Sequence, residues 1–274
     1  MDFSICMSVY KSDNPDYVQM ALDSILVHQS VKPSEIVLVQ DGPISEELSQ
    51  LLSKYEEKYN GIVSVIRLEE NKGLGNALRI GVENAKNILI ARMDSDDICL
   101  PDRFEKQLAF LSEHTEVDIV GGQMTEFIDT PDNIVGRREV PLSNIDIYKY
   151  MKSRCALNHV TVMFRKEAVV KVGNYQDWFW NEDYYLWVRM ILAKCVFANL
   201  PDVLVNVRSG ADQYTRRGGK KYFKSEIGIK KLMLKEGLIT KTQFVINYVE
   251  RLIIQLILPN RVRGWVFRKF ARNK

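Results

Sequence analysis

The sequence predicts an α/β fold built on a central, mostly parallel sheet. In residues 1–122, short apolar runs alternate with segments whose apolar residues recur at helical spacing, an order typical of parallel strands joined by helices. With 46% hydrophobic residues among its 274, the chain can bury a sizeable core. Polar, glycine-containing segments follow the apolar runs, at the strand ends where α/β proteins commonly bind ligands.

The first part of the chain contains five predicted strands and four predicted helices. The strands are expected at Ser4–Val9, Glu35–Gln40, Ile62–Leu68, Asn87–Met93 and Val117–Gly121. The helices are expected at Pro15–Gln29, Ser45–Lys58, Gly75–Ala85 and Pro101–Glu113. Proline suits a first helical turn at both Pro15 and Pro101, because no N–H has to be satisfied there. Val18, Leu22 and Ile25 fall on one face of the first helix, as an amphipathic helix requires.

From about residue 123 the predicted elements become shorter. Strands are expected at Gln123–Ile128, Val160–Phe164, Phe197–Leu200 and Val203–Val207, and helices at Ile145–Lys152 and Glu182–Ala193. Three further helices are expected at Lys221–Glu236, Lys241–Leu258 and Val262–Arg272. The pattern therefore predicts one domain over residues 1–218 and a helical extension over residues 219–274.

Composition argues against several classes of protein. The four cysteines (Cys6, Cys99, Cys155 and Cys195) form no CxxC pair, which disfavours a zinc site or a disulfide framework and fits a reducing compartment. We expect no signal peptide, because no basic segment precedes the first apolar run. No apolar run is long enough to span a membrane. Residues 208–274 contain 17 Lys and Arg against 4 Asp and Glu, which predicts a basic tail that faces an anionic surface.

Three acidic residues, Asp94, Asp96 and Asp97, stand together at the end of the fourth predicted strand. Like charges at this spacing repel one another unless a cation lies among them. A divalent ion with oxygen ligands fits, since magnesium usually keeps positions for substrate phosphates. The alternative is an acidic turn that caps the helix near Pro101.

The other strands of the first part also end in polar segments. Ser8–Lys11 follows the first strand, Asp41 and Gly42 follow the second, and Asn71–Asn76 follows the third. Each segment alone is typical of a plain turn. Because the ends of parallel strands meet at one edge of the sheet, these segments and the acidic run together predict a ligand site there.

The sequence resembles the family 2 inverting glycosyltransferases, which have the GT-A fold and use nucleotide sugars. The residues that carry this resemblance are Ser4-Ile-Cys-Met-Ser-Val-Tyr10, Asp41-Gly42, Asn71-Lys-Gly-Leu-Gly-Asn76, Ala91-Arg-Met-Asp-Ser-Asp-Asp-Ile98, Pro101-Asp-Arg-Phe104 and Asn181-Glu-Asp-Tyr-Tyr-Leu-Trp187. Their order and spacing are specific as a set and cover about residues 3–218. The resemblance implies a nucleotide-sugar-binding half over residues 1–122 and an acceptor-binding half over residues 123–218.

On the donor side, the resemblance assigns Asp41 to the uracil N3–H and the Ser8–Tyr10 backbone to the base. Asp94 and Asp96 correspond to the DxD carboxylates, which hold the ribose and a metal, Mn²⁺ or Mg²⁺, that bridges the diphosphate and stabilises departing UDP. Asp97 is either a third ligand or a helix cap that supports the site. The full set of predicted donor residues is Ser8, Val9, Tyr10, Asp41, Asn71, Gly73, Asn76, Asp94, Ser95, Asp96, Arg216 and Arg217.

On the acceptor side, the resemblance assigns the general base to Asp183, which would take the proton of the acceptor hydroxyl in a single displacement. Glu182 would orient the acceptor or the base. The alternative for both acids is that they complement the dipole of a helix N-terminus. Of three nearby tryptophans, Trp180 is predicted to contact the acceptor sugar. His159 either lines the acceptor side or is structural.

A glycine-containing loop carries Arg216 and Arg217, which are predicted to bind the diphosphate of the donor or of a lipid-linked acceptor. Related enzymes often have a histidine in this region, where this sequence has Ser209. A histidine metal ligand is therefore not predicted there.

The C-terminal helices combine apolar and basic residues. Val245, Val249 and Ile253 belong to an apolar stripe, and tryptophan and phenylalanine alternate with arginine and lysine over residues 262–272. This combination predicts peripheral contact with an anionic membrane, and the alternative is packing on the catalytic domain. No recognised nucleic-acid-binding module accompanies the charge, so no nucleic-acid partner is expected.

The resemblance is nearest to bacterial enzymes that build O-antigen or exopolysaccharide units on polyprenyl diphosphate. It implies transfer of a hexose, galactose or glucose, from a UDP-sugar in β linkage to a lipid-diphosphate-linked sugar such as GlcNAc. The expected location is cytoplasmic, at the inner face of the bacterial inner membrane. A non-catalytic nucleotide-sugar-binding protein is the first alternative. A sugar-phosphate nucleotidyltransferase is the second, and the absence of glycine from residues 8–12 counts against it.

Overall fold

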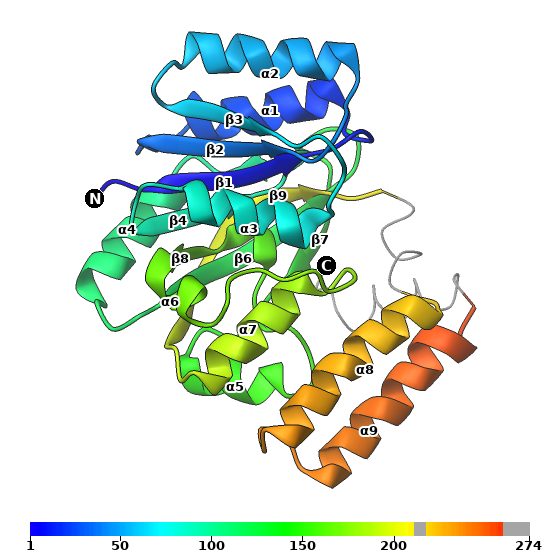
Figure 1. Cartoon of the computed structure of the whole chain (residues 1–274). Coiled ribbons are helices and arrows are strands. Elements are labelled where there is room, and N and C mark those ends of the chain that lie inside the picture. The colour runs from blue at the N-terminus through cyan, green and yellow to red at the C-terminus, as the bar shows by residue number, and fades with distance from the viewer. Residues whose placement is uncertain (211–217, 260–274) are drawn as a thin grey trace.

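The computed structural model describes residues 1–210 and 218–259 (Figure 1). Its strands are β1 (Ser4–Val9), β2 (Glu35–Gln40), β3 (Val63–Arg67), β4 (Leu89–Met93), β5 (Ile98–Cys99), β6 (Ile119–Phe127), β7 (Ile134–Arg138), β8 (Met163–Arg165) and β9 (Phe197–Arg208). Its helices are α1 (Pro15–Leu26), α2 (Glu46–Lys58), α3 (Leu74–Asn84), α4 (Arg103–Glu113), α5 (Asn144–Met151), α6 (Lys166–Lys171), α7 (Glu182–Leu192), α8 (Lys220–Lys235) and α9 (Lys241–Leu252). A 3₁₀ turn covers His159–Thr161, and a π-helical turn over Ile253–Ile257 continues α9.

The strands form a single sheet in the order β3-β2-β1-β4-β8-β6-β9-β5, with β7 paired to β6. Strands β3, β2, β1 and β4 are parallel, which confirms the parallel sheet predicted for the first part of the chain. Beyond β4 the sheet is mixed, because β8 is antiparallel to both neighbours while β6 and β9 are parallel.

Alternate residues of the strands enter different cores on the two faces of the sheet. Ile5 and Met7 of β1 join the core beneath α1, α2 and α4, whereas Cys6 joins the core beneath α3 and α7. This follows from the two-residue period of a strand. Burial on both faces explains why β1 and β2 read as nearly continuous apolar runs rather than as an alternation.

Each of two continuous strands was predicted as a pair of separate strands. Val117–Gly121 and Gln123–Ile128 lie in β6, and Phe197–Leu200 and Val203–Val207 lie in β9. The register between β6 and β9 shifts between Gly121 and Gln123, so the predicted breaks correspond to an irregularity inside a longer ladder. The short strands β5 and β7 and the helix α6 were not predicted.

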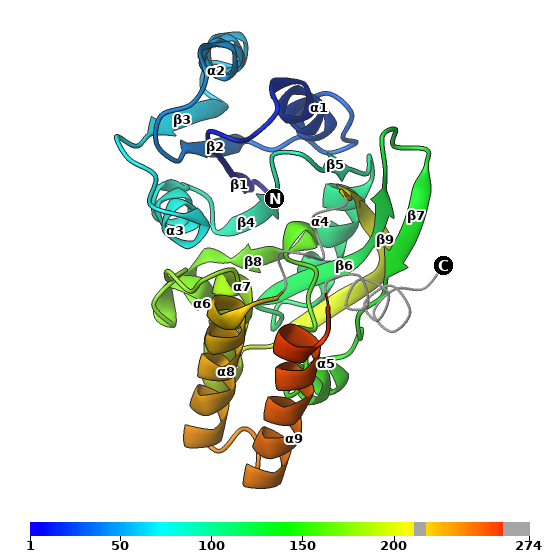
Figure 2. The same cartoon turned by 90° about the vertical axis from the view of Figure 1, so that its right-hand side faces the viewer.

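Helices α8 and α9 form a hairpin that extends beyond the sheet (Figures 1 and 2), as the sequence predicted. Ile229 and Met233 of α8 enter the core shared with α7. Lys230 is fully buried, and its ammonium donates to the carbonyls of Lys152 and Ser153 and to the hydroxyl of Tyr184 at 2.6–3.2 Å. Burial lowers its pKa to about 7. These contacts fasten α8 to α7 and to the segment that follows α5.

The third predicted helix, Val262–Arg272, lies outside the described residues. Within residues 1–210 and 218–259, no helix has the length and apolar character needed to cross a membrane.

Candidate active site

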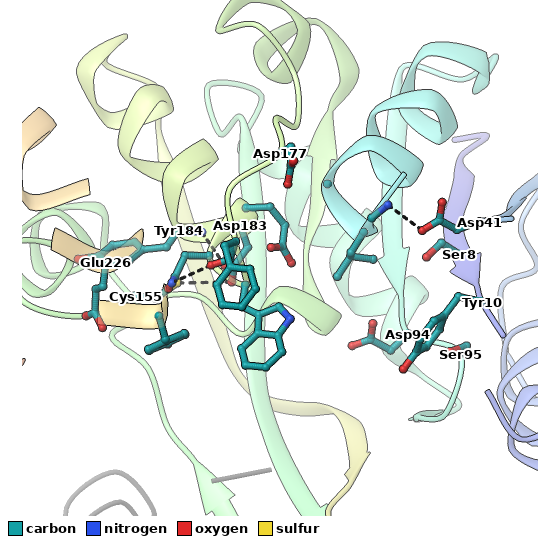
Figure 3. Close-up of a pocket in the computed structure, with 18 of the residues that line it drawn as sticks. Ser8, Tyr10, Asp41, Asp94, Ser95, Cys155, Asp177, Asp183, Tyr184 and Glu226 are labelled. Carbon is teal, nitrogen blue, oxygen red and sulfur yellow. Dashed lines mark hydrogen bonds between the residues drawn. The ribbon is translucent and has the colours of Figure 1, made fainter. Parts of the chain in front are cut away.

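A cavity of about 730 Å³ lies at the carboxyl ends of β1, β2 and β4 and reaches to α7 and the extension. The predicted site residues that line it are Ser8, Tyr10, Asp41, Asn71, Gly73, Asp94, Ser95, Asp96, Trp180, Glu182 and Asp183. Figure 3 shows Asp41, Ser8 and Asp94, which were predicted for the donor side, across the cavity from Asp183 and Cys155. The fold therefore brings the two predicted halves of the site together.

Three predicted site residues do not line this cavity. The side chain of Val9 is buried in the core, although its carbonyl accepts a hydrogen bond from the amide of Asp41 at 2.7 Å. Asn76 donates to the carbonyl of Lys72 at 2.8 Å. His159 packs on Tyr175 and Trp187, and burial lowers its pKa well below the usual range. Arg216 and Arg217 lie outside the described residues.

Asp41 organises the loop that follows β3. Its two carboxylate oxygens accept hydrogen bonds from the amides of Lys72 and Gly73 at 2.6 and 3.0 Å, and Asn71 donates to its carbonyl at 3.1 Å. Gly42 has a φ of +84°, and a Cβ there would lie 2.5 Å from the amide nitrogen of Asn71. The Asp-Gly pair is thus the combination that lets the second and third strand tips touch.

Asp94, in the acidic run, pairs with a buried cationic side chain. The guanidinium of Arg92 on β4 is 3% exposed and forms an ion pair with Asp94. Two of its nitrogens, Nε and Nη1, have no hydrogen-bond partner among the described residues. Asp97 is buried outside the cavity lining, where it accepts a hydrogen bond from the amide of Arg208 at 2.8 Å. Asp97 therefore supports the end of β9.

Asp13, which sequence reasoning missed, joins the acidic run from the β1 side. Its carboxylate accepts hydrogen bonds from the Tyr10 amide at 3.0 Å and from the Ser95 hydroxyl at 2.9 Å. Burial, assisted by the charge of Asp94, raises its pKa to about 6. The pKa of Asp96 is also raised to about 6, by burial and then by Asp94 and Asp13.

The side chains at this edge fit a divalent cation. Asp94 and Asp96 both line the cavity, and the raised pKa values reflect a concentration of negative charge that a cation relieves. In the described part of the chain, no group of three or more Asp, Glu, His or Cys side chains is arranged to hold a metal by itself. A metal held by Asp94 and Asp96 would thus take its remaining ligands from substrate phosphates and water.

Glu182 and Asp183 form the first turn of α7 on the opposite wall. A Cβ on Gly75 would lie 2.6 Å from the Gln176 carbonyl oxygen and 3.3 Å from the Cβ of Glu182, so a glycine lets α3 approach the segment that carries the acids. Burial, together with the charge of Asp183, raises the pKa of Glu182 to about 8. One carboxylate oxygen of Asp183 accepts a hydrogen bond from the amide of Tyr184 at 2.6 Å, and the other lies 4.0 Å from the sulfur of Cys155.

Of the three tryptophans near these acids, Trp180 lines the cavity, and it is half exposed. Its ring stacks on Phe179 with centroids 4.6 Å apart, and its φ of 53° lies in the left-handed region. A non-glycine residue in this region is held there by its surroundings and is commonly found at functional sites. The indole N–H of Trp178 instead donates a hydrogen bond to the carbonyl of Ser225 on α8 at 2.9 Å. Trp187 is buried in the core.

Several lining residues were not identified from the sequence. They come from β7, from the loop after α5, from the segment before α7 and from the extension: Arg138, Arg154, Cys155, Asp177, Phe179, Tyr222, Glu226, Arg251 and Gln255. Only the aromatic cluster of residues 178–180 marked this region in the sequence. The others stand in separate elements with no local motif, so only the tertiary structure brings them to one site.

We expect the stability of the protein to depend on pH through Glu182. Its carboxyl has a pKa near 4.5 when unfolded and about 8 in the fold, so its contribution is fully present below pH 4.5 and is lost as the pH rises through 8. Between pH 5 and pH 9, the free energy of unfolding in urea should therefore fall more for wild type than for Glu182→Gln, by on the order of a few kcal/mol. The exposed Glu83→Gln is the control, and parallel curves for wild type and Glu182→Gln would contradict the prediction.

Comparisons with known proteins identify the family of the chain. The model of glycosyl transferase family 2 matches residues 4–179. An uncharacterized glycosyltransferase of Haemophilus influenzae is 41% identical, covering 99% of this chain and 100% of that protein. The amylovoran biosynthesis glycosyltransferase AmsE of Erwinia amylovora is 38% identical, covering 97% and 98%. The UDP-Gal:alpha-D-GlcNAc-diphosphoundecaprenol beta-1,3-galactosyltransferase of Escherichia coli is 34% identical, covering 98% and 96%.

Solved structures show the same fold. S. aureus TarS 1-349 in complex with UDP-GlcNAc matches with a TM-score of 0.66 at 18% identity, covering 92% of this chain and 73% of that one. The mannosyltransferase PcManGT from Pyrobaculum calidifontis, in complex with GDP-Man and Mn²⁺, matches with a TM-score of 0.65 at 14% identity, covering 99% and 76%. These likenesses confirm the predicted GT-A fold. Since the family model matches more than half of the chain, and relatives 34–41% identical extend along nearly all of it, the chain belongs to glycosyl transferase family 2 and is a nucleotide-sugar-dependent glycosyltransferase.

Proposed function

We propose that this enzyme transfers a hexose, galactose or glucose, from a UDP-sugar to a polyprenyl-diphosphate-linked sugar of the GlcNAc type in O-antigen or exopolysaccharide assembly. The observation that carries the proposal is that Asp94, Asp96, Glu182 and Asp183 line one cavity, with Asp94 across it from Asp183 (Figure 3). A relative at 34% identity, covering 98% of the chain, is named for a reaction of this class, which favours galactose as the first donor to test.

In the proposed mechanism, Asp183 takes the proton from the acceptor hydroxyl as that oxygen attacks the anomeric carbon, giving a β linkage in one displacement. Glu182, whose pKa of about 8 keeps it mostly protonated at neutral pH, donates a hydrogen bond that orients the acceptor. Asp94 and Asp96 would hold Mn²⁺ or Mg²⁺, which when bound supplies positive charge to the diphosphate leaving group. Arg92 holds Asp94 in position, and Trp180 offers an aromatic face to the acceptor sugar.

The proposal also includes peripheral contact with an anionic membrane through α9. The buried residues of α9 and its π-helical turn are polar, namely Asn247, Arg251 and Gln255. Their exposed residues include the apolar Val245, Ile246, Val249, Ile253 and Ile257. Within residues 1–210 and 218–259, this helix turns its polar face inward and leaves its apolar stripe exposed, which supports a membrane or other apolar partner. The basic composition of the extension favours an anionic bilayer.

Replacing Val249 and Ile253 together by aspartate should weaken binding to vesicles that contain anionic lipid by at least tenfold. Each side chain loses apolar burial worth about 1.5–3 kcal/mol, and the new charges repel the bilayer. Vesicle sedimentation measures the effect, with the exposed valine variant Val170→Asp on α6 as a control. If both variants bound vesicles as well as wild type does, the proposed role of α9 in membrane binding would be wrong.

The proposed function is tested by incubating the protein with a synthetic GlcNAc-diphosphate-lipid and a panel of UDP-sugars, with Mn²⁺ or with EDTA. Transfer from UDP-galactose or UDP-glucose, with a β linkage in the product, is the expected result. Failure to transfer from any donor would overturn the acceptor assignment. Transfer that EDTA leaves undiminished would overturn the role of the metal.

A further inference from the structure

The charges that line the cavity are unevenly distributed. The donor side carries Asp13, Asp41, Asp94 and Asp96, while the basic side chains among the described lining residues are Arg138, Arg154 and Arg251. All three come from elements beside Asp183 and the extension rather than from the ends of β1, β2 and β4. Among the described lining residues, a donor diphosphate at the strand ends would therefore face carboxylates, whereas a second anion would find guanidinium groups on the acceptor side.

Two of these arginines line the same cavity as the proposed base. The guanidinium of Arg138, the last residue of β7, donates to the carbonyl of Cys155 at 2.8 Å. The sulfur of Cys155 lies 4.0 Å from an oxygen of Asp183, and Arg154 precedes Cys155 in the chain. Arg251 forms a buried ion pair with Glu226 at 2.6 Å, which ties α9 to α8.

We propose that Arg138 and Arg154 form a subsite for the diphosphate of the acceptor, distinct from the position of the donor diphosphate. The inference rests on the proposed function. The attacking hydroxyl must lie at Asp183, and the acceptor sugar carries its diphosphate at the anomeric carbon, so that diphosphate enters the cavity one sugar ring away from Asp183. Arginine suits this position, because its planar fork binds phosphate oxygens in pairs and stays charged.

The test compares Arg138→Gln, Arg154→Gln and the double variant with wild type, using GlcNAc-diphosphate-lipid and UDP-galactose. Arg137→Gln is the matched control, since Arg137 is the neighbouring residue of β7, pairs with Glu139 and does not line the cavity. We expect the acceptor KM to rise about tenfold or more in each single variant, with the donor KM and the Kd for UDP unchanged. Arg154→Lys should recover part of the loss.

A second measurement separates phosphate binding from a purely structural role. A GlcNAc glycoside of the same alkyl chain without phosphate serves as a competitive inhibitor, and its inhibition constant should be equal in wild type and variants. Equal acceptor KM values, or an equal loss of affinity for the neutral glycoside, would overturn the subsite while leaving the proposed function standing. A wild-type enzyme that transfers nothing to the diphosphate acceptor would overturn the proposed function itself.

Discussion

Replacing Asp183 by asparagine is expected to lower kcat by about two to four orders of magnitude, the usual contribution of a general base, while UDP still binds normally. The amide cannot accept the proton of the acceptor hydroxyl, yet it retains an oxygen to accept the amide of Tyr184, so the first turn of α7 should stay folded. Steady-state kinetics with the lipid-linked acceptor and calorimetric titration with UDP measure the two effects separately.

Glu182→Gln is the matched control for this variant. Because Glu182 has a pKa of about 8, it is mostly protonated at pH 7, and glutamine resembles its neutral form. We expect this variant to keep much more activity than Asp183→Asn. If Glu182→Gln were the more damaging substitution, the base would have to be reassigned to Glu182. Loss of UDP binding in Asp183→Asn would instead indicate a structural role.

The second large effect is expected at the acidic run. Asp96→Asn should lower kcat/KM by about a hundredfold or more, because the charge that develops on departing UDP loses its compensation. EDTA should abolish the activity of wild type, and added Mn²⁺ or Mg²⁺ should restore it. In Asp96→Asn, the metal concentration needed for half-maximal activity should rise, which kinetics over a range of metal concentrations would measure.

Asp97→Asn provides the contrast within the same run. Asp97 is buried, its pKa is raised well above the usual range mainly by burial, and it accepts the amide of Arg208. Asparagine keeps that acceptor oxygen, so activity and metal dependence should change little. A shift in metal dependence as large as that of Asp96→Asn would make Asp97 a ligand rather than a support for β9.

Much of the fold was predictable from local patterns. The bounds of β1 and β2 match the prediction residue for residue, because both are nearly continuous buried apolar runs. The misses have physical causes. β5 consists of two residues, too few for any periodicity, and β7 is a peripheral strand whose first residues are exposed. The long strands β6 and β9 looked interrupted because a register shift lies inside them.

The residues of the candidate site were also predictable from the sequence only in part. The ends of β1, β2, β3 and β4 were identifiable because each places a polar motif directly after an apolar strand. The buried Arg92 stood within one such motif, but its ion pair with Asp94 and its burial depend on the surrounding chain. His159 shows the opposite case, since the residue alone does not reveal that Tyr175 and Trp187 surround it.

By itself, the sequence determined the family, the order of the main strands and helices, and the acidic residues on both sides of the cavity. These features are local, because a strand, a helix or a strand-end motif is determined by residues that are neighbours in the sequence. Only the tertiary structure decided which distant groups share the site, such as Arg138, Arg154 and Asp183, which line one cavity. It also decided the orientation of α9, whose amphipathic pattern is visible in the sequence. A periodic pattern shows that a helix has two faces, and the packing partners decide which face is buried.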